Sequence, residues 1–233
     1  SKIGGEPYLP LDTAYPLDSN GNPLALLAQF NFVEIPSLPN FPDKGILQFY
    51  IAADDLYGMN FDDQQQQSGF RVLYFDHVIE DTSQLRQDFS EFELSEEDYL
   101  PFTGQYSIEF TLTTQPISLG DFAFAPKILG TEDLYDFEDQ FEGGDFENDF
   151  IEPYHELLSA SGHRLGGYPF FTQTDPRQYN ANIQDYILLF QLDSEDAENE
   201  IMWGDSGVGN FFIHPEDLKK RDFSKVLYNW DCY

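Results

Sequence analysis

The sequence contains little of several features that define common protein classes. It has one cysteine, Cys232, in 233 residues, so neither an intrachain disulfide nor a cysteine-ligated metal site can form. No apolar run approaches the roughly 20 residues that span a membrane, and no signal segment opens the chain. Basic residues are scarce, with 11 Lys and Arg against 43 Asp and Glu. We therefore expect a cytoplasmic protein with no membrane-spanning segment.

The resulting net charge of −32 bears on the partners of the protein. A field of this sign repels phosphate backbones and anionic lipid surfaces, so we expect neither a nucleic-acid nor a membrane partner. It attracts a basic protein, although acidity can also serve solubility without any dedicated partner. Hydrophobic residues make up 41% of the chain and aromatic residues 17%, which is enough apolar surface for a folded core.

A short motif that occurs twice organises the chain. Residues 2–7 (KIGGEP) recur as residues 164–169 (RLGGYP), an offset of 162 positions: each copy has a basic residue, an aliphatic residue, two glycines, one free position and a proline. The same offset relates residues 26–30 (LLAQF) to 188–192 (LLFQL) and residues 41–46 (FPDKGI) to 203–208 (WGDSGV). A third segment, 72–74 (VLY), matches 226–228 (VLY) at an offset of 154, which predicts an eight-residue length difference between the copies. The sequence therefore predicts an internal duplication.

The pattern of apolar residues predicts mostly strands. In the first copy we expect strands at 24–33, 45–52 and 70–75, and in the region between the copies a strand at 106–113. In that fourth strand, Ile108, Phe110 and Leu112 alternate with polar residues and are expected to face one side.

Helices are predicted mainly in the acidic region between the copies. One helix is expected over 131–142, with Thr131 as its N-cap, and a second over 149–161, with Gly162 as its C-cap. A short helical turn is expected at 214–218. We therefore predict an α+β, strand-dominated fold with a few helices, in one compact domain. Its two pseudo-equivalent β-rich halves are residues 1–75 and 163–233, joined by the acidic connecting region 76–162.

Four segments carry a resemblance to a known family: residues 2–10 (KIGGEPYLP), 27–30 (LAQF), 203–211 (WGDSGVGNF) and 228–232 (YNWDC). In these segments the chain resembles the YwqG-like family, a bacterial domain of unknown function. The resemblance extends over essentially the whole chain and implies an α+β protein, but no established activity. Some relatives lie in neighbourhoods of secreted toxins and their immunity proteins, which makes an immunity factor one form of the binding role considered below.

Two repeated features invite a structural interpretation before a functional one. Gln29 and Gln191 lie at matching positions in apolar strands, where each amide is expected to hydrogen-bond a loop backbone. Lys2 and Arg164 also match, and bases are scarce. We therefore expect them to pair with the repeated aspartates, Asp43 and Asp205.

Signatures of catalysis are weak. The four histidines, His77, His155, His163 and His214, have no metal-ligand spacing, and His163 is expected to be a loop residue rather than a catalytic base. No nucleophile motif is present. We therefore expect no catalytic residue, no metal and no cofactor, and lean against an enzyme.

Two functional hypotheses remain open. The first is a binding protein, an immunity factor being one form, whose acidic surface recognises a basic protein. The residues assigned to that surface are Glu132, Asp133, Asp136, Glu138, Asp139 and Glu142. The second is a small-ligand binder or enzyme with a cleft between the two halves. The candidate binding residues are Lys2, Gln29, Asp43, Arg164, Gln191, Trp203 and Asp205.

Overall fold

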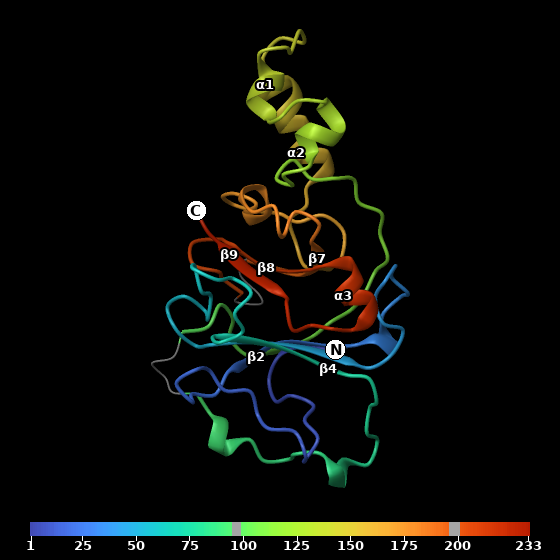
Figure 1. Ribbon diagram of the computed structural model, residues 1–233, viewed down its shortest axis with the longest axis vertical. Coiled ribbons are helices and arrows are strands. Elements are labelled where there is room, and N and C mark those ends of the chain that lie inside the picture. Colours follow the sequence, from blue (N-terminus) through green and yellow to red (C-terminus); the bar gives the residue numbers. More distant parts are fainter. Residues whose placement is uncertain (95–98, 196–200) are drawn as a thin grey trace.

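Two antiparallel β-sheets packed face to face form the centre of the molecule in a computed structural model that describes residues 1–94, 99–195 and 201–233 (Figure 1). The first sheet has the order β4-β3-β2-β1-β5, with β1 (Lys2–Gly4), β2 (Ala25–Asn31), β3 (Ile46–Ile51), β4 (Phe70–Phe75) and β5 (Gln105–Ser107). The second has the order β6-β7-β8-β9, with β6 (Arg164–Leu165), β7 (Ile187–Asp193), β8 (Val208–Ile213) and β9 (Leu227–Asp231).

Helices are short and lie outside the sheets. The α-helices are α1 (Leu134–Glu138), α2 (Glu152–Leu158) and α3 (Pro215–Lys220). The 3-10 turns are η1 (Phe32–Glu34), η2 (Thr82–Gln84), η3 (Ser90–Phe92) and η6 (Pro176–Tyr179), and the π-helical turns are η4 (Ala125–Leu129) and η5 (Glu147–Ile151). The predicted α+β, strand-dominated fold is confirmed.

Strand pairing repeats at the offset seen in the sequence. Lys2 lies opposite Gln29 in the β1–β2 pair, and Arg164 lies opposite Gln191 in the β6–β7 pair. Each copy also has a β-bulge at the same place, between positions 26 and 28 of β2 and between 188 and 190 of β7. The bulge adds one residue to one strand and increases the local twist. The internal duplication is therefore confirmed at the level of individual pairs.

The match of the third strand is wrong by two residues. Phe49 lies opposite Val72, and its counterpart Phe211 lies opposite Tyr228, so Val72 corresponds to Tyr228 and not to Val226. The offset here is 156, and the copies differ by six residues rather than eight. Side chains alternate between the faces of a strand with a period of two, so a two-residue shift keeps every side chain on the same face. The sequence pattern alone cannot distinguish these two registers.

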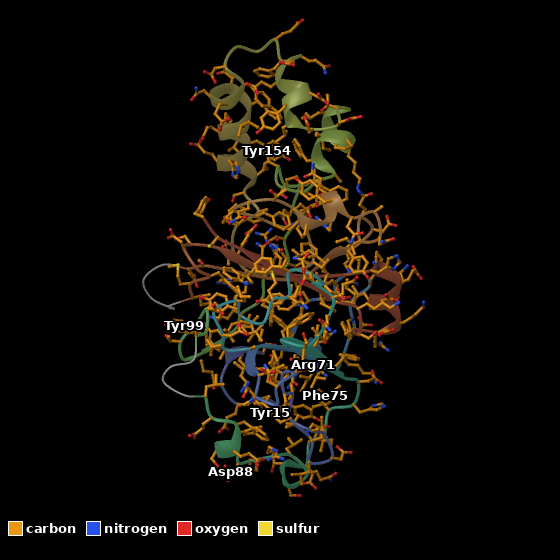
Figure 2. The ribbon with its side chains drawn as sticks, turned by 60° about the vertical axis from the view of Figure 1, so that its left-hand side comes forward. Tyr15, Arg71, Phe75, Asp88, Tyr99 and Tyr154 are labelled. Atoms are coloured by element: carbon orange, nitrogen blue, oxygen red, sulfur yellow. The ribbon has the colours of Figure 1, made fainter. Side chains whose placement is uncertain are left out.

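The core lies between the sheets and is rich in aromatic rings. Phe49 of β3 lies 4.8 Å from Phe211 of β8 and 5.0 Å from Phe190 of β7, measured between ring centroids. The outer face of each sheet is also covered. Leu26 and Tyr50 belong to a buried cluster beneath the loops of the first copy, the layer labelled by Tyr15 in Figure 2. Because both faces are buried, the strands read as continuous apolar runs.

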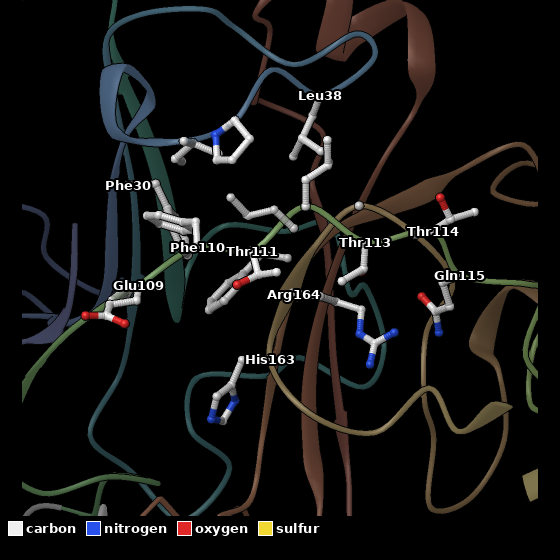
Figure 3. Close-up of a pocket in the computed structure, with 18 of the residues that line it drawn as sticks. Phe30, Leu38, Glu109, Phe110, Thr111, Thr113, Thr114, Gln115, His163 and Arg164 are labelled. Carbon is white, nitrogen blue, oxygen red and sulfur yellow. The ribbon is translucent and has the colours of Figure 1, made fainter. Parts of the chain in front are cut away.

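The predicted strand at 106–113 is shorter in the structure. β5 ends at Ser107, after pairing with β1. The alternation holds for Ile108 and Phe110, which pack against the core, but Leu112 is exposed. Residues 108–116 leave the edge of the first sheet and run towards β6 of the second sheet, so that Gln115 lies near Arg164 (Figure 3). Pairing along an edge requires an adjacent strand, which the local sequence pattern does not reveal.

A helical arm projects from the second sheet (Figure 1). We call residues 125–158, from η4 to α2, the acidic arm. Its first α-helix is shorter than predicted, because Asp133 and not Thr131 is the N-cap: its carboxylate accepts a hydrogen bond from Asp136 N at 2.9 Å. Its last helix ends at Leu158 with Ser159 as the C-cap, so Gly162 is not the C-cap. Tyr154 of α2, labelled in Figure 2, donates its hydroxyl hydrogen to the backbone carbonyl of Ile117 at 2.6 Å and so ties the arm to the segment that precedes it.

Candidate functional site

A cavity of about 1190 Å³ lies where the two copies of the repeat meet. It is bordered by β5, at the edge of the first sheet, and by β6, at the edge of the second. Ile3 and Leu165, which occupy the same position in the two copies, both contribute to its wall. Small-ligand sites typically enclose about 300–1,000 Å³, so this cavity can hold a complete small molecule.

The aromatic side chains of the cavity lining lie mainly on one side of it, together with Glu109, whereas Gln115 and Thr114 lie on the other (Figure 3). These aromatic side chains are Phe30, Tyr106, Phe110 and Phe190, of which Phe30 and Phe190 belong to the core. Leu38 adds a further apolar side chain from another loop. Polar groups come from the segment that crosses between the sheets and from the residues at and before β6. The polar residues labelled in Figure 3 are Glu109, Thr111, Thr113, Thr114, Gln115, His163 and Arg164.

Arg164 is the principal cation of the lining. It is half-buried, and one guanidinium nitrogen donates to the backbone carbonyl of Ser161. Its Nε is buried and has no hydrogen-bond partner in the part of the chain that is described. Burial lowers the pKa of Arg164, and the nearby charge of Asp193 opposes this shift. Arg164 is therefore a partly desolvated cation whose donors are incompletely used.

Gln115 is the second polar group with an unused donor. Its Oε1 accepts a hydrogen bond from Tyr168 N at 3.2 Å, which fixes the side chain next to the second Gly-Gly motif. Its Nε2 is buried and has no partner among the described residues. A buried donor without an acceptor costs about 1–3 kcal/mol, so such groups call for an explanation.

His163 lies in the loop before β6, as predicted. Its Nδ1 accepts a hydrogen bond from Asp193 N at 3.1 Å, and its Nε2 lies 3.3 Å from Glu195 Oε2. Both ring nitrogens are therefore engaged. The imidazole can accept a proton from a substrate only if one of these contacts breaks, so the geometry does not present it as a ready general base.

The paired glutamines bind loop backbones, as predicted. Gln29 Oε1 accepts a hydrogen bond from Tyr8 N at 2.7 Å, and Gln191 Oε1 accepts one from Phe170 N at 2.8 Å. Gln191 is fully buried, and its Nε2 also donates to the carbonyls of Ala160 and Gly162. Neither glutamine lines the cavity.

Sequence reasoning missed the second half of this arrangement. Gln48 Nε2 donates to Tyr8 O at 2.7 Å, and Asn210 Nδ2 donates to Phe170 O at 2.9 Å. Gln48 and Asn210 are themselves 162 positions apart, so each copy holds one loop residue by both its N–H and its carbonyl. The signal was present, since both are amides in otherwise apolar strands.

The predicted ion pairs do not form. Neither Lys2 nor Arg164 has a side-chain nitrogen within 4.0 Å of a carboxylate oxygen of Asp43 or Asp205, all four residues being described. Lys2 instead donates to the backbone carbonyl of Glu6. Both aspartates are exposed, where hydration competes with an ion pair that gains only about 0–1 kcal/mol.

Trp203, the remaining residue of the predicted cleft, is a core residue. Its side chain is fully buried and its ring lies 5.5 Å from that of Tyr57, edge to face. Of the seven candidate cleft residues, the structure brings only Arg164 to the cavity. The duplicated residues other than Arg164 mainly build each copy and its loops, and the cavity forms between the copies.

The six acidic residues assigned to a partner surface all lie on the acidic arm, and all are exposed. Asp133 has a structural task as well, because it caps α1. The arm contains no Lys or Arg between Ile128 and His163. All residues of this stretch are described, and none of its carboxylates lies within 4.0 Å of a basic nitrogen.

Neither a cluster of metal ligands nor a membrane-spanning helix is found in the described ranges. No three His, Cys, Asp or Glu side chains converge there in an arrangement that would hold a metal ion. No helix there combines the length and the apolar composition needed to cross a membrane.

Comparison with known proteins identifies the family of the chain. No curated protein is significantly similar to the chain. A family model described as "Domain of unknown function (DUF1963)" matches residues 1–232, which is nearly the whole sequence. The chain therefore belongs to the DUF1963 family, a domain of unknown function.

Proposed function

We propose that this protein is a binding protein that recognises a basic protein partner through its acidic arm. One observation carries the proposal: eleven Asp and Glu residues lie between positions 132 and 156 of a projecting arm, and no basic nitrogen of the described residues lies within 4.0 Å of their carboxylates. An immunity factor that neutralises a basic toxin is one form of such a protein. The motifs of residues 2–10 and 203–211 further support assignment to the YwqG-like proteins.

The charge of the arm is suited to long-range recognition. Unpaired carboxylates on a projection create a negative potential that extends into solvent and speeds the encounter with a positively charged surface. Carboxylates already bound to Lys or Arg would lose most of this effect. Elsewhere in the protein several acids are paired in this way, such as Glu91 with Arg86 and Glu216 with Lys219.

The arm also offers apolar contact surface between its charges. Ile128, Tyr135 and Leu157 are 57%, 79% and 79% exposed. Stable interfaces combine charged rims with a few buried aromatic or aliphatic anchors, and tyrosine is prominent among such anchors. A basic partner with apolar residues among its charges would therefore complement the arm better than a uniformly charged polymer.

The test compares two variants with the same net charge. In the arm variant, Glu132 and Glu138 become Gln, and Asp136 and Asp139 become Asn. In the control variant, four exposed acids outside the arm change in the same way: Asp12, Asp62, Glu80 and Asp185. Binding of a fluorescent oligolysine peptide, followed by anisotropy, reports the affinity of each protein.

We expect the arm variant to bind roughly tenfold more weakly, since four exposed charges at about 0.3–0.4 kcal/mol each amount to about 1.4 kcal/mol. The control variant should bind nearly as tightly as the unmodified protein, and binding should weaken with added NaCl. Equal losses in both variants, or binding without salt dependence, would contradict the proposal. Affinity capture from the native cell at low and high salt would then identify the partner.

A further inference from the structure

The arginine in the cavity is unusual for so acidic a protein. Acids outnumber bases by 43 to 11, so a base that needs a carboxylate has many to choose from. Arg164 is nevertheless half-buried, and no described carboxylate oxygen lies within 4.0 Å of its guanidinium. Burial of a cation without a close counter-ion is costly, and the charge of Asp193, which lies beyond 4.0 Å, offsets only part of that cost. An arginine kept in this state is available for an anionic group from outside the chain.

A second donor is available in the same lining. Gln115 Nε2 and Arg164 Nε are both buried nitrogen atoms without partners, and both residues border the same cavity. Each is held from its other side, Gln115 by Tyr168 N and Arg164 by the carbonyl of Ser161. Carboxylate oxygens accept hydrogen bonds from such donors, and bonds between charged groups are the strongest of this kind.

The other end of the cavity suits an apolar group. Phe30 and Phe110 lie on one side of the lining and Gln115 on the other, while Leu38 borders the cavity from a separate loop (Figure 3). Thr111 and Thr113 lie along the segment between the two ends. Glu109 lies at the apolar end, so its carboxylate does not neutralise the arginine. A molecule that spans the lining therefore meets hydrogen-bond donors at one end and aromatic surface at the other.

The charge of the protein limits the charge of the ligand. A single guanidinium can offset one negative charge, and the surrounding field of −32 repels any excess. A phosphate monoester carries nearly two charges and is disfavoured on this ground. We propose that the cavity binds a small amphipathic monocarboxylate, with its carboxylate on Arg164 and Gln115 and its apolar body against Phe30 and Phe110. This site is separate from the surface of the acidic arm.

Isothermal titration calorimetry with decanoate and with the neutral alcohol 1-decanol tests the site. Arg164→Met removes the guanidinium but keeps an unbranched side chain, so decanoate should bind roughly 10- to 100-fold more weakly while 1-decanol is unaffected. Lys44→Met makes the same change in net charge at an exposed position outside the cavity, and should change neither affinity. Phe110→Ala should weaken both ligands alike.

Further measurements keep the proposal open to contradiction. Gln115→Leu removes the second donor and should also weaken decanoate selectively, which provides a test if Arg164→Met does not fold. Added NaCl should strengthen decanoate binding, because it screens repulsion by the acidic protein; this is opposite to the effect on a basic partner. No decanoate binding by the unmodified protein, or equal loss of decanoate and 1-decanol in Arg164→Met, overturns the proposal.

Discussion

Phe49 and Phe211 occupy the same position in the two copies of the repeat, and their ring centroids lie 4.8 Å apart. A contact between counterpart residues is also what a two-fold rotation produces at the interface of a symmetric dimer. The two sheets of this single chain meet through such a contact. Both rings are fully buried in the main core cluster.

This contact should be measurable as an energetic coupling. We expect Phe49→Leu and Phe211→Leu each to lower the free energy of unfolding by about 1–2 kcal/mol. In the double variant the losses should differ from additivity by about 0.5–1.5 kcal/mol, because the two rings contact each other. Urea denaturation provides the values. Phe49→Leu combined with Phe124→Leu, which lies in a separate cluster, should be additive; coupling of equal size there would contradict the assignment.

The buried amide of Gln191 should be among the most sensitive polar positions. Gln191→Leu leaves Phe170 N and the carbonyls of Ala160 and Gly162 without partners, and we expect a loss of about 3 kcal/mol or more in the free energy of unfolding. Gln29→Leu should cost less, because Gln29 is only partly buried. The exposed Gln184→Leu serves as the control and should change stability by less than about 0.5 kcal/mol. A small effect at Gln191 would show that water replaces the lost partners.

An ion network that the sequence did not indicate holds the base of the acidic arm. Arg177 Nη2 lies 2.8 Å from Asp121 Oδ2 and 2.6 Å from Asp175 Oδ2, and all three side chains are buried. Arg177→Met leaves two buried carboxylates unpaired, so we expect a loss of about 3–5 kcal/mol in chemical denaturation. Adding Asp121→Asn should recover part of that loss.

A matched control separates this network from ordinary ion pairs. Lys219→Met breaks an exposed pair with Glu216, which should cost no more than about 1 kcal/mol. If Arg177→Met were equally mild, the network would not hold the arm. Limited proteolysis of the arm gives an independent readout, because a loosened base exposes residues 125–158 to cleavage.

The glutamine run of the first copy fastens the two halves together. Gln65 Nε2 donates to the Tyr186 hydroxyl at 2.8 Å, and Gln67 Nε2 donates to Phe223 O at 2.7 Å. The double variant Gln65→Ala/Gln67→Ala should lose about 2 kcal/mol, since each hydrogen bond contributes roughly 0.5–1.5 kcal/mol. Gln66→Ala is the matched control, because among the described residues the Gln66 side chain bonds only to Asn60 of its own loop. If Gln66→Ala lowered stability as much as the double variant, the glutamines would stabilise their own loop and not the contact between the halves.

Asp231 should give stability a measurable pH dependence. Burial raises its pKa above the ordinary value of 3.8, although Thr172 and Gln173 donate hydrogen bonds to it. The folded state therefore holds this proton more tightly than the unfolded state. The contribution of the group is most favourable below pH 3.8 and falls as the pH rises from there through the raised pKa. The free energy of unfolding of Asp231→Asn should thus rise relative to that of the unmodified protein as the pH increases from 3.8 to the raised pKa. Above the raised pKa the difference between the two proteins should stay constant.

Asp81 provides a comparison of opposite sign. Hydrogen bonds from Gln84 and Ser83 lower the pKa of Asp81, so its contribution is present above pH 3.8 and is lost as the pH falls through the lowered value. Asp81→Asn should therefore lose stability relative to the unmodified protein as the pH rises. Thermal unfolding across this pH range measures the stability of both variants relative to the unmodified protein. If the two stability differences changed with pH in the same direction, the opposite pKa shifts assigned to Asp231 and Asp81 would be contradicted.

Much of the architecture follows from local patterns in the sequence. The repeated motifs and apolar runs located β2, β3, β7 and β8, because strands buried on both faces have a distinctive composition. The matching positions of Gln29 and Gln191 also indicated their role, since an amide in an apolar strand must find partners. The helices of the arm were located, but their ends were not, because competing capping residues such as Thr131 and Asp133 lie close together.

The sequence by itself determined the duplication, the acidity of the arm and the strand content, because each is a property of composition or of a repeated spacing. Only the tertiary structure decided the register of the third strand, the partners of Arg177 and the place of Arg164 beside Gln115. These depend on contacts between residues far apart in the chain, where several arrangements satisfy the same local pattern. The cavity belongs to this second group: its wall comes from both copies and from the segment that crosses between them.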